Sequence, residues 1–187
     1  MVKLVDRFFH YMWTYQRDMI ERYYSALGPY LHITSSGDDF GTQNAPFLSP
    51  DAFREMIAPM YKKRIALTKQ LTKAFFFQHT CGSVFRLMDQ FIEVGIDILN
   101  PIQPGALEME PERIKAAYGD KLTFWGGIDE QGLLTNGTPE EVRAEVKRVR
   151  AILWKDGGYV LSPSHNIQVD VPVENILAMY EAAVCGQ

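Results

Sequence analysis

His79 and Cys81 stand two positions apart in the stretch AFFFQHTCG, directly after the apolar run at residues 74–77. In an extended chain, residues i and i+2 point to the same side, so both side chains can reach one ion. Imidazole nitrogen and thiolate sulfur are the donors of tetrahedral zinc sites, and catalytic sites take a third protein ligand. His165, in the later stretch SPSHN, is the candidate for that ligand. Without metal, Cys81 is either a small buried residue or an activated thiolate near the following helix.

Polar side chains also follow the other apolar stretches of the chain. In a parallel α/β fold the carboxyl ends of the strands meet at one edge of the sheet, where active sites form. Five polar strand ends therefore predict a single polar site. We expect three aspartates there as catalytic residues and three amide side chains as substrate-binding residues. They are Asp38, Asp39 and Asp129, with Asn100, Gln103 and Asn166.

The three aspartates each have a second interpretation. Adjacent carboxylates point to opposite sides of an extended chain, so at most one of Asp38 and Asp39 is expected to face the site. That one would act as a base or orient a ligand or a histidine; otherwise both belong to a solvated turn. Asp129 follows Gly126 and Gly127, which allow close backbone approach. It either faces the site or caps the short turn that follows it.

These residues require a framework of alternating strands and helices. Short apolar runs without polar alternation predict strands near residues 30–39, 74–79, 97–101, 122–129 and 158–166. Local signals predict a helix after each strand or loop. Helix starts are marked by an N-cap with proline at Ser49–Pro50, by Pro111, by a capping box at Thr138–Glu141 and by Pro172. A helix end is marked by a C-cap at Gly95.

Five βα units with apolar strands predict an α/β fold in which helices cover a parallel sheet. An amphipathic helix over residues 4–27 precedes the first strand. The pattern leaves open whether the sheet is doubly wound or part of a barrel. The first strand is not followed by a Gly-x-Gly-x-x-Gly motif or a phosphate loop, which disfavours a nucleotide-binding open sheet.

Composition limits the class of protein. The 187 residues, 47% hydrophobic, suffice for one globular core, and we expect a single domain over residues 1–187. A net charge of −4 gives no reason to expect a nucleic acid or an anionic membrane as partner. The sequence shows neither a membrane-spanning apolar run nor a signal peptide. Two cysteines do not form a disulfide framework, which favours a cytoplasmic location.

Five motifs in order resemble the carboxyl-terminal half of the uroporphyrinogen decarboxylase superfamily. They are GDDFGTQ, HTCGSV, DILNPIQP, FWGGID with GTPEEVRAEV, and GGYVLSPSHNIQVDVPVENILAMYEA. The resemblance implies a (β/α)8 TIM barrel of which only strands four to eight are present, a partial barrel. The superfamily also includes cobalamin-dependent methyltransferases, which move methyl groups from methyl-corrinoid proteins to thiols.

The resemblance is nearer the methyltransferase branch, which carries a His-x-Cys zinc motif and a third ligand, usually cysteine, after the last strand. His79 and Cys81 match this motif, and His165 stands where the cysteine is expected. The resemblance thus implies zinc held by His79, Cys81 and His165, with a methyl-corrinoid on a partner protein as methyl donor. It implies that Asp38 or Asp39 orients ligands.

Two alternatives remain open from the sequence. One is a metal-free decarboxylase of tetrapyrrole biosynthesis, in which His165 and Asp39 donate protons or orient the substrate; the arginine-rich and aspartate motifs that such enzymes carry near the amino terminus have no match here. The other is an inactive or split half barrel. An open five-stranded sheet exposes two edges, so a missing amino-terminal half or a second copy would cover them.

Overall fold

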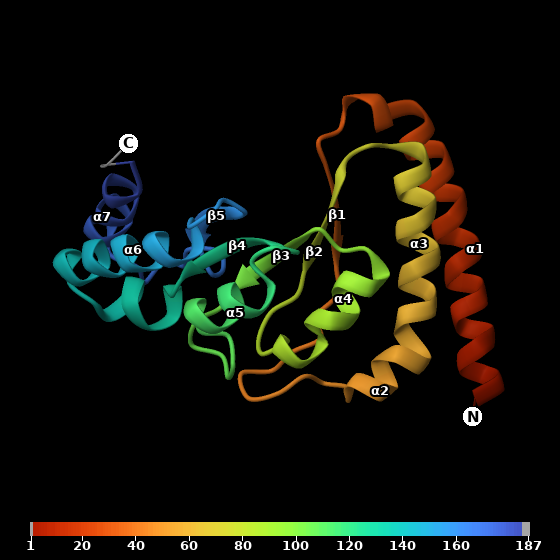
Figure 1. Cartoon of the computed structure of the whole chain (residues 1–187), viewed down its shortest axis with the longest axis horizontal. Coiled ribbons are helices and arrows are strands. Elements are labelled where there is room, and N and C mark those ends of the chain that lie inside the picture. The colour runs from red at the N-terminus through yellow and green to blue at the C-terminus, as the bar shows by residue number, and fades with distance from the viewer. Residues whose placement is uncertain (1, 185–187) are drawn as a thin grey trace.

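The computed structural model describes residues 2–184, and Cys185 lies outside them. Within these residues the chain forms one five-stranded sheet in which all neighbouring strands are parallel and follow one another in chain order (Figure 1). The strands are β1 (Ile33–Gly37), β2 (Phe75–His79), β3 (Ile98–Ile102), β4 (Thr123–Ile128) and β5 (Tyr159–Pro163).

Seven α-helices within residues 2–184 connect or flank these strands. They are α1 (Val2–Leu27), α2 (Pro50–Ala52), α3 (Ala58–Leu71), α4 (Met88–Val94), α5 (Pro111–Tyr118), α6 (Pro139–Leu153) and α7 (Val173–Val184). Figure 1 shows them arranged around one side of the curved sheet, from α1 and α3 at one end to α6 and α7 at the other. The described residues also form two 3-10 turns, at Gly28–Tyr30 and Phe85–Leu87, and two π-helical turns, at Phe53–Ile57 and Glu130–Leu134.

The local signals in the sequence position these helices as predicted. The Ser49 hydroxyl accepts a hydrogen bond from the Ala52 amide at 3.1 Å, and Thr138 and Glu141 form both bonds of a capping box. Gly95 ends α4 in the left-handed conformation. The helix that Gly95 ends begins as a 3-10 turn at Phe85 and becomes α-helical at Met88.

The strand order decides the question that the sequence left open. A doubly wound sheet reverses its order at a switch point, whereas β1 to β5 run in sequence without a reversal. Burial alternates along β2: Phe76 and Gln78 are buried on the side of the sheet that the helices cover, while Phe75 is exposed on the opposite side. The helices therefore cover one face of the sheet and leave the other open. The structure is therefore a partial (β/α)8-type barrel, as predicted.

The core lies between the convex face of the sheet and the helices, and it is built from fully buried side chains such as Leu99, Phe124, Ile114 and Val146. The concave face is open among the described residues, with Ile33, Phe75 and Val160 exposed.

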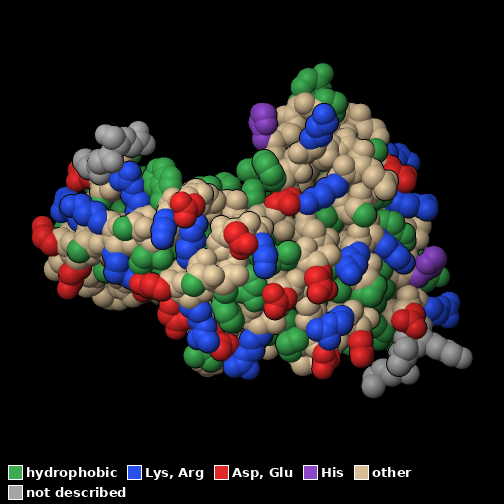
Figure 2. Space-filling model, in the orientation of Figure 1, with side chains coloured by type: hydrophobic (Ala, Val, Ile, Leu, Met, Phe, Trp, Pro, Cys, Tyr) green, Lys and Arg blue, Asp and Glu red, His purple; other side chains and the backbone are tan. Residues whose placement is uncertain are grey.

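Acidic and basic side chains are interspersed over the surface seen in Figure 2. Of the helices within residues 2–184, none is long and apolar enough to cross a membrane.

A substitution at Gly126 in β4 tests whether the packing of this strand against β3 requires a glycine. Its φ is +126°, and an added Cβ would lie 2.7 Å from the Ile102 amide nitrogen of β3. We expect Gly126→Ala to lower the free energy of unfolding by about 2 kcal/mol or more in urea denaturation. Gly105→Ala is the matched control, because a Cβ added at that position would meet nothing within 4 Å. Equal effects at both glycines would contradict this account.

Candidate metal centre

The three predicted metal ligands come together at the carboxyl edge of the sheet. One ligand atom from each of His79, Cys81 and His165 lies within 4.8 Å of the other two. Cys81 Sγ is 3.5 Å from His79 Nε2, and the two imidazole centroids are 6.4 Å apart. Zinc–ligand bonds of about 2.1–2.3 Å place tetrahedral donors about 3.5 Å from one another. The donor types and their spacing therefore fit a zinc ion, with one coordination position left for a substrate.

Asn100 fixes the orientation of the His79 ring. The Asn100 side-chain oxygen lies 2.8 Å from His79 Nδ1, and its amide nitrogen donates to the Trp125 carbonyl at 3.4 Å. Because an amide oxygen only accepts, the proton sits on Nδ1 and the lone pair on Nε2 faces Cys81. Metal-binding histidines are commonly oriented in this way by a second hydrogen bond. Asn100, which the sequence analysis predicted to bind substrate, is thus placed to orient His79, one of the three candidate metal ligands.

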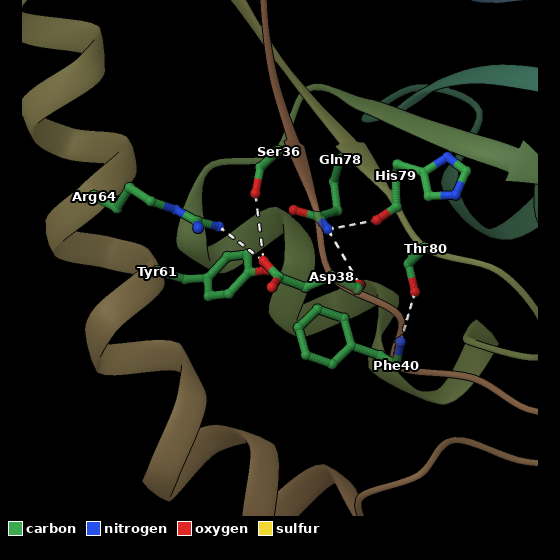
Figure 3. Close-up of polar contacts among 8 residues, drawn as sticks. All are labelled: Ser36, Asp38, Phe40, Tyr61, Arg64, Gln78, His79 and Thr80. Atoms are coloured by element: carbon green, nitrogen blue, oxygen red, sulfur yellow. Dashed lines mark hydrogen bonds and ion pairs between the residues drawn. The ribbon is translucent and has the colours of Figure 1, made fainter. Parts of the chain in front are cut away.

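The segment 38–40 holds the loop that carries His79 and Cys81. The Asp38 amide donates to the His79 carbonyl at 3.1 Å. The Phe40 amide donates to the Thr80 hydroxyl at 2.9 Å, as Figure 3 shows. The Cys81 amide donates to the Asp39 carboxylate at 2.9 Å. We call residues 38–40 the strap. These three hydrogen bonds fix the backbone of residues 79–81, which carries two of the three candidate metal ligands.

The two adjacent aspartates of the strap point in different directions, as predicted. Asp39 turns towards Cys81. The Asp38 carboxylate turns instead towards α3, as Figure 3 shows. There it accepts hydrogen bonds from the Tyr61 and Ser36 hydroxyls, and it lies 3.5 Å from a terminal nitrogen of Arg64. Asp38 therefore anchors the strap to a helix, and only Asp39 is placed at the candidate site.

The surroundings of Cys81 keep its thiol protonated in the absence of a metal. Burial above all, together with the nearby carboxylates of Asp39 and Glu130, raises the pKa of the Cys81 thiol to about 11. This argues against the interpretation of Cys81 as an activated thiolate without metal. A cation bound beside it would replace the proton and offset the negative charge of both carboxylates.

Asp129 has the capping role that the sequence left as one of two options. Its carboxylate accepts hydrogen bonds from the amides of the three residues after Glu130, at 3.1–3.2 Å. These bonds satisfy the free amides at the start of the Glu130–Leu134 turn. The carboxylate is occupied by this structural task and lies outside the three-ligand cluster.

Glu130 belongs to the site but was not predicted. It is 6% exposed, and its carboxylate accepts a hydrogen bond from the Ser164 hydroxyl, which is itself buried. Ser164 directly precedes His165, so this pair fixes the loop that carries the third ligand. The second acidic residue in the stretch GGIDEQG was the signal that could have indicated it.

The two remaining predicted residues lie at the margins of the site. Gln103 is buried, and its side-chain oxygen accepts from the Gly82 amide, which holds the backbone after Cys81. Asn166 is exposed, and its carbonyl accepts from the Gln168 side chain at 3.0 Å. Neither side chain is among the three that gather for a metal.

Two grooves meet at the ligand cluster. The inner groove, of about 640 Å³, is on the concave side and is lined by His79, Asn100, Trp125, His165, Asn166 and Tyr180 among others. The outer groove, of about 670 Å³, is lined by Cys81, Gly82, Gln103, Glu130 and His165 among others. His165 lines both, so the candidate metal position is reached from two directions.

The fold and this cluster define a barrel-type α/β protein with a candidate metal centre at the carboxyl ends of its strands. The chain belongs to the uroporphyrinogen decarboxylase family, whose model matches residues 35–184. The family membership inferred from the sequence motifs is thereby confirmed.

Individual relatives match shorter stretches. The uroporphyrinogen decarboxylase of Psychromonas ingrahamii is 39% identical over 61 residues, which cover 33% of this chain and 17% of the relative. That of Pseudoalteromonas atlantica is 32% identical over 71 residues, covering 38% and 19%. A methyltransferase from Methanosarcina mazei has a similar fold, with a TM-score of 0.62 and 21% identity over 81% of this chain and 41% of its own. Each match thus spans less than half of the relative.

Thiol reactivity tests the influence of Asp39 on Cys81. In a metal-free chain carrying Cys185→Ser, we expect iodoacetamide to alkylate Cys81 slowly near pH 8 and faster as the pH rises towards 11. Asp39→Asn removes a negative charge beside the sulfur, so the pKa falls and alkylation near pH 8 accelerates. The exposed Glu140→Gln is the control. An unchanged rate in Asp39→Asn would refute the assigned electrostatic effect.

Ser164→Ala tests the buried pair beside His165. It removes the hydroxyl that donates to the Glu130 carboxylate and leaves that charge unsatisfied. We expect the free energy of unfolding to fall by about 2 kcal/mol, measured by urea denaturation at neutral pH. Ser162→Ala, two positions earlier and within β5, is the control, because the Ser162 hydroxyl donates to the adjacent Pro163 carbonyl. A loss no larger than that of the control would show that the pair does not stabilise this loop.

Proposed function

We propose that this protein takes part in zinc-dependent methyl transfer, from a methyl-corrinoid carried by a partner protein to a thiol. The observation that carries the proposal is the approach of His79, Cys81 and His165 to within 4.8 Å of one another. These residues would hold zinc, leaving one position for the thiol. When bound, zinc would lower the pKa of that thiol so that it is a thiolate at neutral pH.

The protein's own groups have defined tasks in this proposal. Asn100 holds the proton on His79 Nδ1 and so keeps Nε2 free for coordination. The strap fixes the backbone of Cys81, and Glu130 with Ser164 fixes the loop of His165. The negative charges of Asp39 and Glu130 near Cys81 favour a cation at this position.

The third ligand departs from the pattern that the sequence resemblance implied, since His165 replaces a cysteine. Two imidazoles and one thiolate donate less charge than one imidazole and two thiolates. A thiolate substrate would therefore be a poorer nucleophile here. The carboxylates of Asp39 and Glu130 are the groups near Cys81 that partly offset this difference.

The two grooves support a reaction between two partners. A thiol could occupy one groove while the methyl donor approaches through the other, with His165 between them. The corrinoid would remain on its own protein. The Methanosarcina mazei relative is named a methyltransferase, and its similarity in fold is consistent with the proposal. The chemistry needs Cys81 reduced, which agrees with the cytoplasmic location expected from the sequence.

The names of the curated relatives favour a second candidate, the metal-free decarboxylation of a tetrapyrrole. In that case the inner groove would hold the substrate, and the exposed His165 would donate a proton or orient a carboxylate. Asp39 would assist from the side of Cys81. Metal content separates the two candidates, because only the first requires zinc.

Elemental analysis of the purified 187-residue chain is the test. We expect about one zinc per chain, and little in Cys81→Ser or His165→Ala, because each substitution leaves two protein ligands. His32→Ala removes a histidine remote from the cluster and should retain the metal. Absence of zinc from the unmodified chain after reconstitution would rule out the methyl-transfer mechanism and leave decarboxylation as the better candidate.

A further inference from the structure

The outer groove differs from the inner groove in charge. Its lining includes the carboxylates of Glu130 and Asp170, and neither lysine nor arginine is among the described residues that line it. The inner groove is lined by aromatic, amide, hydroxyl and imidazole side chains, with no carboxylate among the described residues there. Because both grooves reach His165, a ligand of the candidate metal centre meets negative charge on one side and a neutral surface on the other.

The two carboxylates of the outer groove differ in how accessible they are to a ligand. Glu130 is buried and accepts a hydrogen bond from the Ser164 hydroxyl, so its charge is a fixed part of the groove. Asp170, five positions after His165, is exposed and has no hydrogen-bond or ion-pair partner within residues 2–184. Its carboxylate is therefore available to a cationic group in the groove, while Glu130 adds to the attraction from behind.

Uncharged acceptors line the same groove. Gln43, Gln131 and Gln168 each contribute an amide side chain to its lining. The Gln168 side-chain nitrogen donates to the Asn166 carbonyl at 3.0 Å, which leaves its side-chain oxygen as an acceptor. An ammonium group has three donors and no acceptor, so it needs several such oxygens together with a carboxylate. The outer groove supplies both kinds of partner.

The charge around the candidate metal centre favours the same ligand. Zinc with the Cys81 thiolate would carry one net positive charge, and the two carboxylates that act on the Cys81 sulfur, those of Asp39 and Glu130, would exceed it. A substrate thiolate would add a further negative charge. A second anionic group on that substrate would be repelled, whereas an ammonium group would offset the excess.

We propose that the outer groove selects an aminothiol, a thiol that carries an ammonium group on a short carbon chain. Its sulfur would occupy the open metal position, and its ammonium group would lie beside Asp170. The inner groove, lined by Trp125 and Tyr180, is then left for the methyl donor. This inference rests on the proposed function, because it names the class of thiol that the proposed function requires.

The charge selectivity of the outer groove is measured without metal through Cys81, which lines it. In a metal-free chain carrying Cys185→Ser, Cys81 is the sole cysteine. Two methanethiosulfonate reagents of similar size, one with a trimethylammonium group and one with a sulfonate, each react with this thiol. Their rate constants are divided by those for 2-mercaptoethanol. We expect the cationic reagent to be favoured about tenfold at low ionic strength, and less in about 1 M salt. Equal rates, or a preference for the anion, would overturn the proposal.

Substitution of Asp170 assigns this selectivity to the groove. Asp170→Asn should lower the ratio of cationic to anionic rate about threefold, and Asp170→Lys should lower it further. Asp120→Asn is the matched control, because Asp120 is also exposed but precedes β4 and so lies at the opposite edge of the sheet. If Asp170→Asn changed the ratio no more than Asp120→Asn, the assignment of the ammonium group to Asp170 would be refuted.

Direct binding of thiols completes the test. Cobalt(II) replaces zinc as a spectroscopic probe, and the thiolate-to-cobalt absorption is followed while cysteamine, 2-mercaptoethanol or 3-mercaptopropionate is added to the loaded chain. These thiols differ in acidity, so each affinity is compared between the unmodified chain and Asp170→Asn. We expect cysteamine to bind about threefold more weakly in the variant, 2-mercaptoethanol to bind equally and 3-mercaptopropionate to bind more tightly.

The outcomes of the binding test separate this inference from the proposed function. Failure of the unmodified chain to take up metal would refute the proposed function and the aminothiol with it. Uptake of metal, with affinities for the three thiols that Asp170→Asn leaves unchanged, would refute the aminothiol alone and leave zinc-dependent methyl transfer standing.

Discussion

The curvature of the parallel sheet is the constraint on which the candidate site depends. His79 and Cys81 follow β2 and His165 follows β5, with two strands between them. In a flat sheet, strands three positions apart would be about 14 Å from one another. The helices cover only the convex side, and Gly126 in β4 has a backbone that other residues rarely adopt. The resulting bend brings ligand atoms from both strands to within 4.8 Å.

Hydrogen bonds to neighbouring loops turn this approach into a defined geometry. The strap fixes one side through Asp39, and the Glu130–Ser164 pair fixes the other. Both contacts place a carboxylate, that of Asp39 or that of Glu130, near the Cys81 sulfur, and this contributes to the raised pKa of the Cys81 thiol. Positioning and electrostatics are therefore linked, because the groups that hold the loops also make the position favourable for a cation and unfavourable for a bare thiolate.

The open concave face gives the inner groove its access and leaves β1 and β5 as free edges among the described residues. Membership of the uroporphyrinogen decarboxylase family, and a fold similar to 41% of a methyltransferase chain, place this arrangement within a larger barrel architecture. The exposed large apolar side chains are concentrated on the first and last helices, while neither α4 nor α5 carries one. The exposed apolar surface is thus concentrated at the two ends of the sheet.

The sequence by itself determined the features that depend on residues close together in the chain. The capping box at Thr138–Glu141 sets a helix start, and the two-residue period of a strand placed His79 and Cys81 on one side. Only the tertiary structure decided the contacts between distant segments, such as the Asp39–Cys81 bond, which spans 42 positions. Such pairings depend on strand order and on the curvature of the sheet, which no local pattern encodes. For the same reason the strand order could be established only from the structure, which confirmed the barrel that the family resemblance implied and revealed Glu130 at the site.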